Sequence, residues 1–257
     1  MFWFAVIMLF FPIISIVIYS FNDSKRITIW RGFTFNNYTK AFFDLGLREA
    51  FINSLTIAAA STVISLVLGI MSAYLLWRFR FWGRTFYGSM LSLPIVVPEI
   101  CMGVSLLLFF NKVFGGISLG SSWPANLILI IIAHVTFCFP FVSMVISARI
   151  NLYSFDQLEA AFDLGANEVR AFFDVVLPFL KPALIASAML AFTLSLDDFV
   201  ITFFTSGPDS VTFPVKVYSM LRFSVTPVVN AASTILIVIT VLLTLGGMAV
   251  QKKVLID

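Results

Sequence analysis

The sequence predicts an all-α polytopic membrane protein with six transmembrane helices in one domain. Three observations lead to this fold class. Of the 257 residues, 60% are hydrophobic and only 11% are charged, whereas a soluble domain carries roughly a quarter charged residues. The mean hydropathy is +1.04. Apolar runs of the length that crosses a bilayer, about 20 residues, recur along the whole chain.

The six candidate spans are apolar runs separated by polar or Gly/Pro-rich connections. They cover residues 2–21, 49–77, 85–114, 124–148, 182–204 and 228–250. The first lacks the basic start and small-residue cleavage site of a signal peptide, so we expect a retained membrane helix. Pro94 and Pro98 should bend or break the third span, because proline lacks a backbone N–H. The connections 22–48, 115–123 and 205–227 are expected to be loops, and 251–257 a short tail.

Several functional classes are unsupported by the sequence. It contains neither GxGxxG nor GxxxxGK followed by Ser or Thr, so no nucleotide site is predicted. The net charge of +3 is too small and too scattered for a nucleic-acid partner. Cys101 and Cys138 lie in apolar runs, and with one histidine in the chain neither a metal site nor a disulfide is expected. No catalytic residue is predicted.

The connection 149–181 is unusually polar for this chain. Ser154 followed by Gln157 is typical of a capping box, which starts a helix. Gly165 suits a helix end, because glycine adopts the left-handed conformation. We therefore predict short helices over about 155–164 and 168–176. Pro178 and Pro182 should mark the start of the fifth span.

The first of these helices is amphipathic. Leu158, Ala161 and Phe162 share a small apolar face, whereas Glu159 and Asp163 lie on another face. On periodicity alone, an ordinary solvated loop with helix propensity explains the segment equally well.

A longer pattern favours a specialised role for this connection. Glu159, Ala160 and Ala161 are followed after three residues by Gly165, and after nine more by Val175. One residue later come Leu177 and Pro178. The series resembles the EAA signature of ABC-importer permeases, with Val175 in place of isoleucine.

The resemblance implies a type I ABC-importer permease architecture. In that family the loop is cytoplasmic and forms helices that contact a separate ATPase subunit, so Glu159, Ala160, Ala161, Gly165, Leu177 and Pro178 would couple this chain to the ATPase. The Lys and Arg residues of the connections divide evenly between the two sides, so charge alone does not set the orientation. The resemblance would place both termini in the cytoplasm.

Three acidic residues fall inside predicted spans, namely Glu99, Asp197 and Asp198. An ionisable residue in the membrane costs roughly 2.5–3.5 kcal/mol on insertion scales, so it suggests a functional site. If the third and fifth spans both start on the cytoplasmic side, the three carboxylates lie at similar heights. They indicate a path for a cation, next to a proline-broken helix.

Other interpretations of these residues stay open. Each carboxylate could be protonated and purely structural, or could relay protons in a secondary carrier. Because neighbours on a helix point about 100° apart, one of Asp197 and Asp198 could face a cavity while the other hydrogen-bonds elsewhere. His134 in the fourth span is interpreted as a hydrogen-bonding helix contact.

A second resemblance concerns the cargo. The run from Ala191 to Val238, including SLDDFV and VNAASTIL, and the run HVTFCFPFV from His134 to Val142 resemble the second permease subunit of spermidine/putrescine importers. Polyamines are flexible multiple cations, which carboxylates neutralise and aromatic rings hold by cation–π contact. Phe199, Phe203 and Tyr218 are candidate rings for such contacts.

The resemblance also implies partners. They are a second permease chain, two ATPase subunits that bind ATP and Mg, an extracytoplasmic polyamine-binding protein, and the lipid of a bacterial inner membrane. The connections 22–48 and 205–227 would receive the binding protein. No cofactor is expected in this chain. The alternatives are an importer of another organic cation and a proton-coupled carrier that works alone.

Overall fold

The structure is a computed structural model, which describes residues 2–24, 29–113, 125–223 and 226–256. Helices dominate these ranges. The only β contact within these described ranges is an isolated antiparallel bridge between Asn22 and Phe33. The all-α prediction is therefore confirmed.

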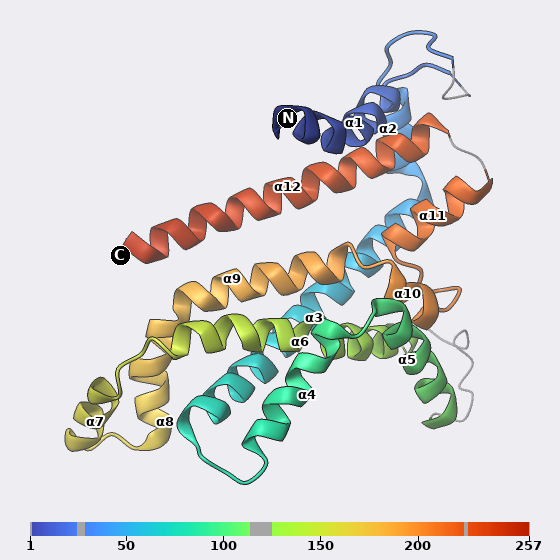
Figure 1. Ribbon diagram of the computed structural model, residues 1–257. Coiled ribbons are helices and arrows are strands. Elements are labelled where there is room, and N and C mark those ends of the chain that lie inside the picture. Colours follow the sequence, from blue (N-terminus) through green and yellow to red (C-terminus); the bar gives the residue numbers. More distant parts are fainter. Residues whose placement is uncertain (1, 25–28, 114–124, 224–225, 257) are drawn as a thin grey trace.

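The helical elements follow one another through the whole described chain (Figure 1). In order they are α1 (Phe2–Ser20), α2 (Asn36–Phe43), α3 (Leu45–Arg78), α4 (Arg84–Val96), α5 (Glu99–Val113), α6 (Ala125–Ile150), α7 (Phe155–Asp163), α8 (Glu168–Ala171), the π turn η1 (Phe172–Val176), α9 (Leu177–Leu196), α10 (Val200–Thr205), α11 (Phe213–Phe223) and α12 (Pro227–Ile256).

Within the described residues, four helical stretches are long and apolar enough to cross a membrane: Leu45–Arg78, Asn126–Ile150, Glu168–Leu196 and Pro227–Ala249. The pair α4 and α5 could form a fifth span, bent by 108° at its break. This break confirms the prediction drawn from Pro94 and Pro98. Val6–Ser20 of α1 is a shorter apolar helix, so the count of six spans stays a prediction.

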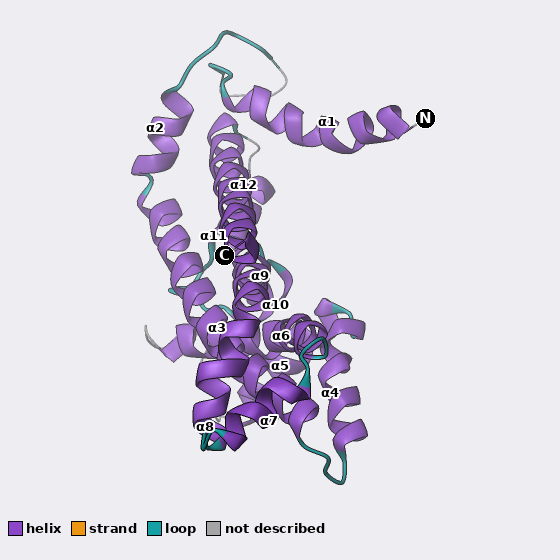
Figure 2. Cartoon of the chain, turned by 90° about the vertical axis from the view of Figure 1, so that its left-hand side faces the viewer, coloured by secondary structure: helices purple, strands orange, loops and turns teal. Residues whose placement is uncertain are grey.

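The centre of the molecule is formed by α3, α6 and α9, which contact one another. α12 lies between α9 and α1 (Figure 1), and Figure 2 shows α1 projecting away from the bundle toward its N terminus. The face of α3 that packs inward carries small side chains, among them Ser54, Ala58, Ser61, Ser65, Gly69 and Ser72. Small residues allow membrane helices to approach closely.

Gly69 shows how close this approach is. A Cβ added to it would lie 2.5 Å from Cγ1 of Val142 and 3.1 Å from the backbone nitrogen of Ser143 on α6. Only glycine leaves room for α6 at this point.

The fifth span differs from its predicted bounds of 182–204. Helical backbone begins at Glu168, passes through the π turn and continues to Leu196. Pro178 lies in the first turn of α9, directly after the π turn, and Pro182 lies inside that helix. The wider turn of η1 carries the backbone into the proline-containing segment without a break, so neither proline starts a new element.

The other end of this span also differs from the prediction. α9 ends at Leu196 with Asp197 as its C-cap, and the separate helix α10 starts only at Val200. The hydrophobic run is continuous here, but the helix is not.

Three connections contain helices that were not predicted. α2 lies within 22–48 and α11 within 205–227, while α12 continues through the predicted tail as far as Ile256. The sequence had indicated connections at these places without assigning helices to them. The Gly/Ser-rich connection 115–123 lies outside the described residues.

Candidate functional site

The segment after α6 folds as a helical pair, α7 and α8, as the sequence predicted. Ser154 begins α7: its Oγ accepts from the Asp156 backbone N–H at 3.3 Å and donates to Asp156 Oδ2 at 2.8 Å. The predicted capping box with Gln157 is therefore replaced by a local contact with Asp156. A short acidic side chain two residues after the cap reaches the hydroxyl directly.

Gly165 forms the turn between the two helices. Its φ is +86°, in the left-handed region that side chains with a Cβ disfavour. Its N–H donates to the Phe162 carbonyl at 2.8 Å, and the Ala166 N–H to that of Ala161 at 3.0 Å. Asn167 then caps α8, accepting from the Arg170 N–H at 2.8 Å.

The pair presents one face to the protein and another to the outside. Leu158 is buried, whereas Glu159 and Ala160 are exposed and Ala161 is half-buried. At the end of the motif, Leu177 is half-buried and Pro178 is exposed. The exposed residues of the helical pair are available to a partner protein.

The same segment is held tightly against the end of α3. Arg78 Nη2 lies 2.7 Å from Glu168 Oε1, and the Tyr74 hydroxyl donates to Glu168 Oε2 at 3.3 Å. The rings of Trp77 and Phe155 stack with centroids 4.5 Å apart. These contacts tie the helical pair to a helix that spans the molecule.

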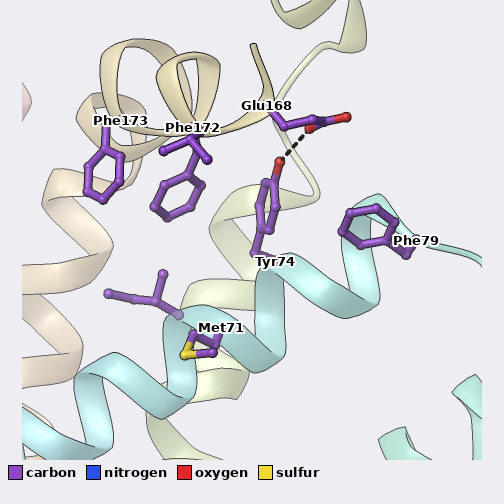
Figure 3. Close-up of a pocket in the computed structure, with 8 residues that line it drawn as sticks. Met71, Tyr74, Phe79, Glu168, Phe172 and Phe173 are labelled. Carbon is purple, nitrogen blue, oxygen red and sulfur yellow. Dashed lines mark hydrogen bonds between the residues drawn. The ribbon is translucent and has the colours of Figure 1, made fainter.

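A pocket of about 260 Å³ opens beside this junction. Figure 3 shows Tyr74 reaching from α3 toward Glu168, with Phe172 beside it and Phe173 further along the same segment. The centroids of Tyr74 and Phe172 are 4.9 Å apart. The walls are largely apolar, so the pocket offers contact area and few polar groups.

A second group of candidate residues lies at the break between α9 and α10. Asp197 is exposed, whereas its neighbour Asp198 is buried. Asp198 Oδ2 accepts from the Thr202 N–H and from the Thr202 hydroxyl, both at 2.8 Å, and Oδ1 accepts from the Ile201 N–H at 3.3 Å. The carboxylate thus caps the start of α10.

Glu99 lies near Asp197 although the two are far apart in sequence. It is the first residue of α5 after the bend, and it is exposed. Its carboxylate is close enough to that of Asp197 to interact with it electrostatically. α5 packs against α10, where a Cβ on Gly103 would meet Phe204 at 2.8 Å. The two breaks, between α4 and α5 and between α9 and α10, therefore lie close together (Figure 1), and each carries an exposed acid.

The predicted aromatic residues form one cluster, of which Phe199 follows Asp197 by two residues in the chain. The ring centroids of Phe199 and Tyr218 are 4.8 Å apart, those of Phe199 and Phe203 are 5.4 Å apart, and those of Phe203 and Tyr218 are 6.1 Å apart. Phe203 and Tyr218 are exposed and Phe199 is half-buried. Exposed acids and ring faces in one region suit an organic cation.

His134 makes the interhelical hydrogen bonds that the sequence suggested. Its Nδ1 lies 2.6 Å from Ser195 Oγ on α9, and its Nε2 lies 2.9 Å from Thr202 Oγ1 on α10. Ser61 on α3 donates to Ser195 Oγ at 2.9 Å. Ser61, Ser195 and Thr202 carried no separate signal in the sequence, because hydroxyl residues are common in packed membrane helices.

The model of one protein family matches residues 65–254, and its description is "Binding-protein-dependent transport system inner membrane component". The chain belongs to this family. It is therefore a permease, the membrane subunit of a transport system that works with a binding protein.

Curated relatives lie within the same family. The permease is 41% identical to the putrescine transport system permease protein PotI of Escherichia coli, over 89% of this chain and 81% of that one. It is 39% identical to the spermidine/putrescine transport system permease protein PotC of Haemophilus influenzae, over 95% and 92% of the two chains. It is thus homologous to permease subunits of polyamine transporters.

Solved structures support the fold. A chain of a bacterial ABC transporter involved in import of the acidic polysaccharide alginate matches with a TM-score of 0.77 at 17% identity, covering 98% of this permease and 92% of that chain. The MetNI methionine ABC transporter matches with a TM-score of 0.67 at 16% identity, over 81% and 95%. The type I ABC-importer permease architecture is confirmed.

Proposed function

We propose that this permease forms half of the translocation path of an ATP-driven polyamine importer, with spermidine and putrescine as cargo. The observation that carries the proposal is the similarity to PotC, which extends over 95% of this chain at 39% identity. Similarity of this extent includes both the helical pair and the break between α9 and α10.

The acidic and aromatic side chains described above would line the translocation path and bind the polyamine. Glu99 and Asp197 would neutralise ammonium groups, while Phe199 and Tyr218 would contact them and the methylene spacers between them. A cation held against a ring gains about 0.5–2 kcal/mol, depending on its hydration. Asp198 belongs to the same region but is turned into the bundle.

The movement of the ATPase subunits would be transmitted to this permease through α7 and α8. The exposed Glu159 and Ala160 would contact the ATPase, and the Gly165 turn would fix the angle between the two helices. The ion pair of Arg78 with Glu168 would pass the movement to α3. A rigid helical pair transmits a rigid-body movement, which a loose loop would absorb.

The remaining parts of the transporter follow from this assignment. Two ATPase subunits would bind ATP and Mg and carry out hydrolysis, so this chain would need no cofactor and no catalytic residue. A second permease would complete the path, and an extracytoplasmic binding protein would deliver the polyamine near α2 and α11. The chain would lie in a bacterial inner membrane, in contact with lipid, with both termini in the cytoplasm.

Uptake by the reconstituted transporter tests this function. The permease, its second permease and the ATPase are placed in liposomes, and labelled spermidine or putrescine is added together with the binding protein. Uptake that requires both ATP and the binding protein supports the proposal. Uptake of a different organic cation alone, or uptake by this chain alone under a pH gradient, would contradict it.

A further inference from the structure

Asp197 and Asp198 are adjacent, yet their surroundings are opposite. Asp197 is exposed and Asp198 is 8% exposed. Both lie between the end of α9 at Leu196 and the start of α10 at Val200. Because the backbone is not helical there, helix geometry does not decide which carboxylate points inward. The partners of Asp198 decide it.

These partners come from two sources. The Ile201 and Thr202 groups belong to α10 itself, so they fix the carboxylate only relative to its own short helix. His134 belongs to α6, and its Nε2 lies 3.4 Å from Asp198 Oδ2 as well as 2.9 Å from Thr202 Oγ1. His134 therefore ties this cap to the centre of the bundle.

The hydrogen bonds can be written as one directional chain. Ser61 donates to Ser195, which leaves the Ser195 proton free to donate to His134 Nδ1. The ring then carries its proton on Nε2 and donates to Thr202 Oγ1, and the Thr202 hydroxyl donates to Asp198 Oδ2. The Ser195 and Thr202 hydroxyls each accept one hydrogen bond and donate another, and such chains strengthen their members.

His134 itself is no part of the path. It is 1% exposed, and both ring nitrogens are engaged by hydroxyl groups of α9 and α10. A cargo molecule could not reach the ring without breaking these contacts. Its effect on transport must therefore be indirect.

We propose that His134 is a positioning residue: it anchors the Asp198 cap to α6 and so holds the break at which Asp197 faces the cargo. The two aspartates then have different roles, since Asp198 fixes the backbone and Asp197 meets the ammonium group. Transport of an ammonium cargo rests on the proposed function, whereas the anchoring of the break does not.

Thiol labelling tests the anchoring without any cargo. Cys101→Ser and Cys138→Ala remove the two cysteines of the chain, and Asp197→Cys then supplies a single thiol in the assembled transporter. Because thiol reactivity follows exposure, a water-soluble methanethiosulfonate should modify the exposed position 197 readily. Adding His134→Ala should change the rate at position 197 severalfold.

The chain without its two native cysteines also supplies a matched control. Cys138→Ala already truncates a buried side chain of α6 one turn from His134, and Val142→Ala truncates another. Val142→Ala should leave the labelling rate at position 197 unchanged. No effect of His134→Ala on the rate at position 197, or an equal effect of Val142→Ala, would overturn the proposal.

Uptake per assembled transporter gives the second readout. His134→Ala and Asp197→Asn should lower polyamine uptake to similar levels, and the double variant should be no worse than either, because both act on one element. His134→Gln, whose amide can still donate to Thr202, should recover part of the loss. Effects that multiply in the double variant would contradict positioning.

The two readouts separate the two proposals. If labelling follows the expectation but the unaltered transporter takes up no polyamine, the proposed function fails and the positioning role stands. If uptake is normal and labelling is insensitive to His134→Ala, the positioning role fails alone.

Discussion

Arg78 and Glu168 are separated by 90 residues, yet the Nη2 and Oε1 atoms lie 2.7 Å apart. The pair joins the last turn of α3 to the first residue of α8. α3 crosses the bundle and α8 belongs to the helical pair, so this contact lies where a movement of the pair would reach the membrane helices.

Loss of this ion pair should weaken coupling more than stability. Both side chains are partly exposed, so Arg78→Gln should cost no more than about 1 kcal/mol of stability. We expect ATP-driven uptake per assembled complex to fall severalfold, because α8 is no longer held to α3. Reversing both charges, Arg78→Glu with Glu168→Arg, should restore part of it.

The control for that pair lies on the same segment. Arg170 and Asp174 form an exposed ion pair at 3.3 Å, within one helical stretch. Arg170→Gln should lower uptake less than Arg78→Gln does, because it leaves the link between α8 and α3 in place. If it lowers uptake as much as Arg78→Gln does, the loss reflects altered surface charge and not the link to α3.

Substitution of Gly69 should disrupt the contact of α3 with α6. An alanine Cβ would lie 2.5 Å from Val142 Cγ1 and 2.9 Å from Val142 Cβ. Overpacking of this kind costs about 1–3 kcal/mol. Thermal unfolding of the purified transporter in detergent should show Gly69→Ala at a lower temperature than the unaltered protein.

Two further variants sharpen this test. Val142→Ala removes Cγ1 and should recover part of the stability lost in Gly69→Ala. Gly88→Ala on α4, whose Cβ would meet nothing within 4 Å, should be neutral or mildly stabilising, since alanine favours a helix by about 1 kcal/mol. Equal loss for Gly69→Ala and Gly88→Ala would contradict close packing as the cause.

Gly165 allows strain to be tested without a clash. A Cβ there would meet nothing within 4 Å, so any penalty comes from the positive φ, at about 1–2 kcal/mol. Uptake should decrease in the order Gly165, Gly165→Asn, Gly165→Ala, because asparagine tolerates this conformation better than alanine does. An alanine variant as active as the unaltered permease would show that the turn geometry does not matter.

The path residues should affect the cargo and not the fold. Glu99→Gln and Tyr218→Leu alter exposed side chains, so assembly and thermal stability should hold. Spermidine uptake should lose apparent affinity about 5- to 30-fold, the equivalent of one or two kcal/mol. Phe86 is an exposed ring on α4, outside the aromatic cluster. Phe86→Leu is therefore the matched control, and it should leave spermidine uptake unchanged.

The sequence predicted the parts of the fold that depend on local chemistry. Ser154, Gly165 and the apolar face of Leu158 act within a few residues, so helix, turn and helix could be expected. α2 and α11 were missed because each is too short and too polar to stand out by mean hydropathy, although their apolar residues recur at the helical period and could have indicated them.

The break after Leu196 shows a second limit. SLDDFVITFF remains apolar on both sides of the acids, so hydropathy continues through a point at which the helix ends. The roles of the two aspartates depend on His134, Ser195 and Thr202, which three separate elements supply. Only the folded chain brings these groups together.

Cross-linking of α7 to the ATPase tests the central claim most directly. Ala160→Cys, in the chain without Cys101 and Cys138, is placed in the assembled transporter beside single cysteines on the ATPase surface. We expect an efficient cross-link whose yield changes when ATP binds, and labelling by a membrane-impermeant reagent only from the cytoplasmic side. No cross-link to the ATPase, together with labelling from the outer side, would contradict coupling through this helical pair.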